Sequence, residues 1–219
     1  MAPIAAPVLA DTALPIRLDA LAQAALVTAP FRFVYVPGFV AAEMQARVYD
    51  DFPVIAKAGS YPVDILDYGP AFGTLVAALE GPPMRRAIEA KFGLSLAGRP
   101  TMVTVRGMGR GRDGTIHTDS ATKVITLLIY CNRRWDHDGG RLRLLRGPDD
   151  IEDYVLEIPP VGGNMVAFQR STTSFHGHLP ASEPRRLLQL NWMVDPAARD
   201  RELARHRRSA WVKRLNPFA

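Results

Sequence analysis

The sequence predicts an α+β fold, mainly β, in which helices support a double-stranded β-helix of the jelly-roll type. From Thr101 onward, short runs of β-branched and aliphatic residues alternate with turn residues, whereas the first hundred residues carry helical spacing. A length of 219 residues with 47% hydrophobic content suits one domain with a sizeable core. We therefore expect a single domain over 1–219, with helical support in 1–100, a β core in 101–194 and a basic helix in 195–219.

The first hundred residues predict one strand followed by three helices. Residues 31–36 alternate between apolar and other side chains, as in a half-buried strand, and Pro37-Gly38 ends that run. Gly81-Pro82 separates the last two helical segments. The expected helices span residues 41–52, 71–79 and 83–92.

The second half predicts a succession of short strands. Gly139-Gly140 and Gly162-Gly163 supply residues that tolerate a positive φ at two of the turns. Strands at such regular intervals favour a sandwich or jelly roll over a parallel sheet. The seven expected strands span residues 101–106, 123–131, 141–146, 154–158, 164–168, 174–178 and 186–194.

Composition excludes several classes of protein. Charged residues at 22% together with many apolar runs exclude a disordered chain, and no apolar run is long enough to span a membrane. Residues 1–10 lack the basic residues of a secretory signal. The single cysteine, Cys131, lies in an apolar run and cannot form an internal disulfide, which favours a reducing, cytoplasmic location.

The net charge of +5 arises entirely from the C-terminal segment, where seven basic residues outnumber two acidic ones after Asp195. A basic helix of this kind could bind nucleic acid or could be the solvated face of a docking helix. Leu203, Trp211 and Leu215 recur near the helical repeat, so we expect them to pack inward. The docking interpretation is preferred, and a nucleic-acid-associated protein remains the alternative.

His117-Thr118-Asp119 is the motif that points most directly to chemistry. Side chains at positions i and i+2 of a strand point the same way, so His117 and Asp119 can reach one metal ion. A later histidine, His176, would complete two imidazoles and one carboxylate, the facial set that leaves three positions of Fe(II) open. His178 competes with His176, but Gly177 and Pro180 suggest that the strand is ending there.

Two further residues are candidates for binding a carboxylate beside that metal. Arg186 shares the two-residue period of Leu188, Leu190 and Trp192, and its planar guanidinium suits a carboxylate. Arg185 is the adjacent rival, and the parity with Trp192 favours Arg186. On the strand predicted for 123–131, Tyr130 could donate its hydroxyl to the same carboxylate.

Five motifs together resemble the prolyl-hydroxylase-like branch of the Fe(II)/2-oxoglutarate-dependent oxygenases. The resemblance covers roughly residues 101–194, and the strand and helix after Pro30 are similar to the family's N-terminal support. The five motifs are His117-Thr118-Asp119, the segment 124–132 with Ile129-Tyr130-Cys131-Asn132, Trp135 followed by Gly139-Gly140, Phe175-His176-Gly177, and the segment 186–192.

The resemblance implies a dioxygenase, with His117, Asp119 and His176 as iron ligands and with O2 and 2-oxoglutarate as co-substrates. Arg186 would pair with the distal carboxylate of 2-oxoglutarate and Tyr130 would hydrogen-bond to it. The products would be succinate, CO2 and a hydroxylated substrate, whose identity stays open together with the oligomeric state. A catalytically silent binding module is the alternative.

Two positions depart from the pattern of the family. Arg106 stands where relatives often carry a tyrosine, on the strand before the His-x-Asp motif, and His178 stands where a valine is frequent. The pocket around the metal is therefore expected to differ from that of those relatives.

Overall fold

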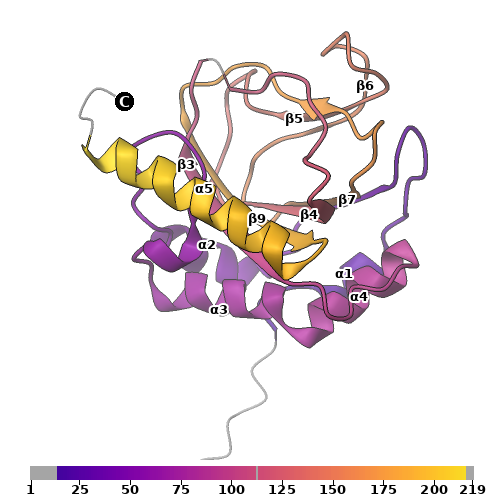
Figure 1. Ribbon diagram of the computed structural model, residues 1–219, viewed down its shortest axis with the longest axis horizontal. Coiled ribbons are helices and arrows are strands. Elements are labelled where there is room, and N and C mark those ends of the chain that lie inside the picture. The colour runs from indigo at the N-terminus through magenta and orange to yellow at the C-terminus, as the bar shows by residue number, and fades with distance from the viewer. Residues whose placement is uncertain (1–13, 112, 216–219) are drawn as a thin grey trace, which may run out of the picture.

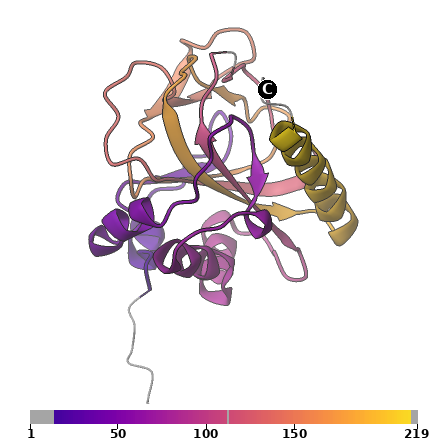
Figure 2. The ribbon, with the colours of Figure 1, turned by 90° about the vertical axis from the view of Figure 1, so that its left-hand side faces the viewer.

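A computed structural model describes residues 14–111 and 113–215 of the chain. Two antiparallel sheets face each other, and four helices cover the outer face of the larger one (Figure 1). The larger sheet has the strand order β1-β7-β4-β9-β3-β2 and the smaller one the order β6-β5-β8. Turning the molecule by 90° shows the last helix, α5, along one side of the two sheets (Figure 2).

The strands of the larger sheet are β1 (Phe33–Val36), β2 (Tyr61–Pro62), β3 (Thr101–Met108), β4 (Lys123–Tyr130), β7 (Met165–Gln169) and β9 (Pro184–Met193). Those of the smaller sheet are β5 (Leu142–Leu145), β6 (Tyr154–Ile158) and β8 (His176–Gly177). All eight strands expected from the sequence form, with bounds that differ by a few residues. The two-residue strand β2, which pairs with β3, was not expected.

The helices are α1 (Leu18–Gln23), α2 (Ala42–Asp50), α3 (Pro70–Glu80), α4 (Pro82–Phe92) and α5 (Pro196–Leu215), with a 3-10 turn at Val63–Ile65. A proline in the first turn begins α3, and the Asp51 carboxylate accepts a hydrogen bond of 2.6 Å from the Ala71 amide there. Gly93, at φ 60°, ends α4 in the left-handed conformation that glycine adopts without strain. Helix α1 was not expected.

The central strands β4 and β9 are buried on both faces. One face of β4, with Ile125, Leu127 and Ile129, packs against the helices in the larger core. The other face, with Leu128 and Tyr130, packs between the two sheets. Each residue of these strands therefore belongs either to the helix side or to the inside of the sandwich, where the candidate site lies.

Helix α5 differs from its expected packing. Trp211 was predicted to face inward but is 63% exposed, Leu203 is only partly buried, and the side chain of Leu215 lies outside the described residues. The inward stripe instead follows Ala198, Glu202, His206 and Ala210 at four-residue spacing. This prediction failed because an exposed tryptophan at helical spacing looks the same in sequence as a buried one.

Within the described residues, no helix combines the length and the apolarity needed to cross a lipid bilayer. Cys131 is buried in the core between the larger sheet and the helices, as expected of a small apolar side chain. Burial raises the pKa of its thiol to about 12.

Candidate metal centre and co-substrate pocket

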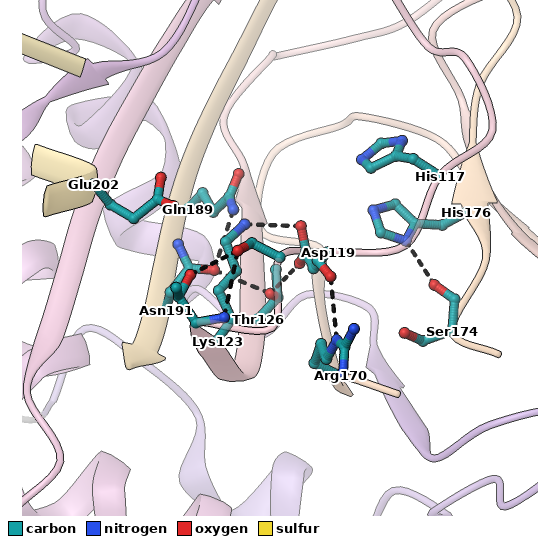
Figure 3. A network of polar contacts seen from close by, with 12 residues as sticks. His117, Asp119, Lys123, Thr126, Arg170, Ser174, His176, Gln189, Asn191 and Glu202 are labelled. Atoms are coloured by element: carbon teal, nitrogen blue, oxygen red, sulfur yellow. Dashed lines mark hydrogen bonds and ion pairs between the residues drawn. The ribbon is translucent and has the colours of Figure 1, made fainter. Parts of the chain in front are cut away.

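His117, Asp119 and His176 meet at one end of the sandwich. His117 forms an isolated antiparallel bridge with His176, and their imidazole rings lie 4.4 Å apart between centroids. One potential ligand atom of each of the three residues lies within 4.8 Å of the others. Figure 3 shows the two imidazoles side by side, and Asp119 near them with its carboxylate hydrogen-bonded to Lys123 and Thr126. The β-bridge between His117 and His176 therefore brings together residues that are far apart in sequence.

Backbone carbonyls orient both imidazoles. Nδ1 of His117 lies 2.8 Å from the Thr115 carbonyl oxygen, and Nδ1 of His176 lies 3.0 Å from that of Ser174. A carbonyl accepts only, so each Nδ1 carries the proton and each Nε2 keeps its lone pair. Burial, partly opposed by Asp119, lowers the pKa of His176 to about 4, which keeps this ring neutral at pH 7. An imidazole whose Nδ1 donates to a backbone carbonyl has its Nε2 available for a metal ion.

The Asp119 carboxylate is buried and held in its ionised form. Burial alone would raise its pKa, but the ammonium of Lys123 and hydrogen bonds from Lys123 and Thr126 outweigh that effect and lower it to about 2. Lys123 Nζ lies 2.8 Å from Asp119 Oδ1, and the Thr126 hydroxyl donates to Oδ2 (Figure 3). Two imidazoles and one carboxylate fit the facial donor set of non-haem Fe(II).

The three residues line a cavity of about 370 Å³ between the two sheets. This volume lies within the usual range for small-molecule sites. Its wall comes from β3, β4 and β9 of the larger sheet, from His178 beside the candidate ligands, and from α5, which contributes Glu202, Arg205 and His206. His178 lines the cavity but does not belong to the group of three potential ligands.

Arg185 is the buried arginine of this cavity. Its Nε donates to the Gly140 carbonyl oxygen at 2.7 Å, and its Nη2 lies 3.4 Å from the Tyr130 hydroxyl. The guanidinium also lies over the Tyr130 ring, 5.3 Å from its centroid. Tyr130 is fully buried, and burial raises the pKa of its hydroxyl, so it stays a hydrogen-bond donor. Arg185 and Tyr130 thus form a preorganised pair that suits a carboxylate.

The structure corrects the placement expected for Arg186. Its side chain lies on the helix side of β9, where Nη1 donates to the Tyr49 carbonyl oxygen at 2.9 Å. The guanidinium packs 4.0 Å from the centroid of the Tyr49 ring and 5.4 Å from that of Phe52. Arg186 and Trp192 do share one face of β9, as predicted. That face, however, packs in the core against the helices rather than inside the sandwich.

Several residues of the cavity were not expected from the sequence. Parity places Thr126 on the strand face of Leu128 and Tyr130, but no role beside the metal was expected for it. The α5 residues could have been found less easily. Their inward stripe follows the helical repeat, but two of its four members are polar; the four are Ala198, Glu202, His206 and Ala210. Lys123, which pairs with Asp119, has no sequence signal that we recognise.

Residues 103–194 match the sequence model of the 2OG-Fe(II) oxygenase superfamily. Over these residues the chain is similar to the 2OG-Fe(II) oxygenase superfamily. Such enzymes use Fe(II) and 2-oxoglutarate, which agrees with the cofactors expected from the motifs and with the donor set of the cavity. The oxygenase core includes every residue of the candidate metal centre, together with Tyr130 and Arg185.

A solved structure supports the same fold for this chain. A prolyl-4-hydroxylase from Pseudomonas putida is similar over 80% of this chain and 91% of its own, with 21% identity and a TM-score of 0.51. A prolyl 4-hydroxylase from Phytophthora capsici is similar over 75% of this chain and 61% of its own, with 16% identity and a TM-score of 0.49. No curated protein sequence matches the chain significantly.

Proposed function

We propose that the protein is a dioxygenase that binds Fe(II) through His117, Asp119 and His176 and 2-oxoglutarate through Arg185 and Tyr130. The observation that carries the proposal is that a His-Asp-His group, with Asp119 and His176 buried, shares one cavity with a buried, preorganised arginine. When bound, the two cofactors supply the oxidising power to hydroxylate a substrate with O2, releasing succinate and CO2.

The chain's own residues would prepare the cavity for this chemistry. The carbonyls of Thr115 and Ser174 keep both Nε2 atoms directed at the metal position. Lys123 and Thr126 hold the Asp119 carboxylate ionised and fixed in direction.

Arg185 would bind the distal carboxylate of 2-oxoglutarate, since its guanidinium is the buried cation that neighbours Tyr130. Gly140 fixes that guanidinium through its carbonyl oxygen, so little side-chain entropy is lost when the carboxylate binds. Leu128, Leu142, Phe168 and Leu187 form an apolar lining that would limit the access of water.

The test is release of succinate from 2-oxoglutarate by the purified protein with Fe(II) and O2, together with anaerobic titration of Fe(II) and 2-oxoglutarate. We expect both cofactors to bind and succinate to form slowly without a prime substrate. A chain that binds neither cofactor contradicts the proposal. A chain that binds both but releases no succinate, even with fractionated cell extract added, would be a silent binding module.

A further inference from the structure

Arg106 lines the same cavity as Arg185 and Arg205, and the proposed function gives it no task. It lies on β3, with Leu187 of β9 as its register partner. Met102, Thr104 and Arg106 alternate along β3 and line the cavity, whereas Val103 and Val105 pack on the helix side. The strand period therefore turns the Arg106 side chain into the sandwich.

No described residue neutralises Arg106. Its Nε is buried without a hydrogen-bond partner within residues 14–111 and 113–215. Burial, then the charge of Arg185, lower its pKa, while Asp113 and Asp119 oppose this. Both carboxylates are engaged elsewhere: Asp119 with Lys123 at 2.8 Å, and Asp113 with Arg110 at 3.5 Å. Arg106 is half-buried, and a guanidinium whose Nε is buried without a partner or counterion is costly, which indicates that an anion completes the site.

The other charges of the cavity wall are balanced. Lys123 pairs with Asp119, and Arg205 pairs with Glu202 at 2.5 Å. Arg185 would be neutralised by 2-oxoglutarate under the proposed function. Arg106 is then the one described cation of this wall that neither a carboxylate of the chain nor the co-substrate accounts for.

Arg106 and Arg185 differ in their surroundings. In the larger sheet, β3 stands between β9, which carries Arg185, and β2, on which α5 packs. Its charge reaches α5, because after burial and Arg205 it is among the charges that lower the pKa of His206. Arg185 is instead fixed toward Gly140 and Tyr130. The two guanidinium groups therefore serve different parts of the cavity.

We infer that Arg106 binds an anionic group, a carboxylate or a phosphate, of a small prime substrate lying between the candidate iron ligands and α5. This inference rests on the proposed function. The fork of a guanidinium matches either anion in two parallel hydrogen bonds. The substrate must be small because it shares about 370 Å³ with 2-oxoglutarate and meets a wall of Glu202, Arg205 and His206.

The first experiment measures binding without turnover. Protein loaded with Fe(II) and 2-oxoglutarate under argon is titrated with acetate or methyl phosphate at constant ionic strength, and the visible absorption band of the iron complex is followed. We expect a saturable change for at least one anion, with the apparent Kd raised about tenfold or more in Arg106→Met. Arg106→Lys should lose less, and Arg110→Met, which removes a neighbouring charge outside the cavity, should respond as the wild type does.

The titration distinguishes a carboxylate from a phosphate. It also distinguishes failure of the Arg106 inference from failure of the proposed function. A response to acetate alone assigns a carboxylate, and a response to methyl phosphate alone assigns a phosphate. No saturable response to either anion, or the same response in Arg106→Met and wild type, overturns the inference. Loss of 2-oxoglutarate binding by the wild type would instead overturn the proposed function.

The second experiment uses turnover. Succinate release is measured with a panel of free L-amino acids, their C-terminal amides and small phosphate monoesters. Only compounds with an anionic head group should stimulate release, and a calorimetric Kd for each should rise about tenfold or more in Arg106→Met. Stimulation by the amides, or by a proline-containing peptide and none of the acids or phosphates, overturns the inference.

Discussion

Arg185 and Arg186 are consecutive in β9, yet their guanidinium groups lie on opposite sides of the larger sheet. Arg185 lies over the Tyr130 ring inside the sandwich, and Arg186 packs on the Tyr49 ring beneath the helices. The two-residue period of a strand makes this opposition obligatory. A one-residue error in sequence reading therefore moves a proposed cofactor contact to the far side of the sheet.

The first prediction uses this pair as a matched comparison. Arg185→Met should raise the Kd for 2-oxoglutarate about tenfold or more, because a charge-assisted pair contributes about 1.5–3 kcal/mol. Arg186→Met should leave that Kd almost unchanged and lower the melting temperature, because it removes the contacts with Tyr49 and Phe52. Anaerobic calorimetry and thermal unfolding measure the two effects. A larger loss of affinity in Arg186→Met would return the assignment to Arg186.

The second prediction compares the two histidines that flank Gly177. His176→Ala should abolish stoichiometric Fe(II) binding, because it removes one of three candidate ligands. His178→Ala should keep the iron, since His178 lies outside that group although it lines the cavity. Metal content after anaerobic loading and desalting measures the difference. Iron retained in His176→Ala but lost in His178→Ala would exchange their roles.

A third prediction concerns the support of Asp119. Thr126→Val removes the hydroxyl that donates to Asp119 Oδ2 and keeps nearly the same shape. We expect Fe(II) affinity to fall about 10- to 100-fold, as is typical when a group that orients a metal ligand is lost. A competition titration with a chelator of known affinity measures it. Thr122→Val, whose hydroxyl donates to Ser120, is the control, and equal affinities in the two variants would deny Thr126 this role.

Strand parity in the sequence was enough to group Thr126, Leu128 and Tyr130 on one face, because every second residue of a strand shares its side. It could not say which face of β9 looks into the cavity, since Leu187, Leu188, Leu190 and Trp192 are all buried. A strand that is apolar on both faces loses the contrast that identifies its inner side. The contribution of α5 was also beyond prediction, because it depends on how the helix docks beside β2.

A fourth prediction follows from two histidines near the cavity mouth. Burial and then the charge of Arg185 lower the pKa of His178 to about 4, and burial and Arg205 lower that of His206 to about 4, from 6.5. Between about pH 4 and pH 6.5 the unfolded chain binds more protons than the folded one, so the free energy of unfolding decreases as pH falls. The free energy of unfolding of the metal-free protein should therefore be lower at pH 4 than at about pH 6.5.

Urea denaturation at several pH values measures this loss. His206→Gln should reduce the slope of stability against pH in that window, because one of the groups that must take up a proton on unfolding is gone. His137→Gln, which replaces an exposed histidine, is measured alongside as the matched control. Identical slopes for all three proteins would mean that His206 titrates as it does in the unfolded chain.

The last prediction tests the packing of α5. Trp211 is 63% exposed, so Trp211→Ala should change the melting temperature little, although loss of a buried tryptophan costs about 3–5 kcal/mol. Ala210 is 1% exposed on the inward stripe, and Ala210→Leu should destabilise by about 1–3 kcal/mol because the larger side chain has no space. Since the same stripe carries Glu202 and His206 into the cavity wall, Ala210→Leu should also weaken acetate or methyl phosphate binding by the loaded protein. A stable Ala210→Leu variant together with an unstable Trp211→Ala variant would mean that Trp211 faces inward and Ala210 faces outward.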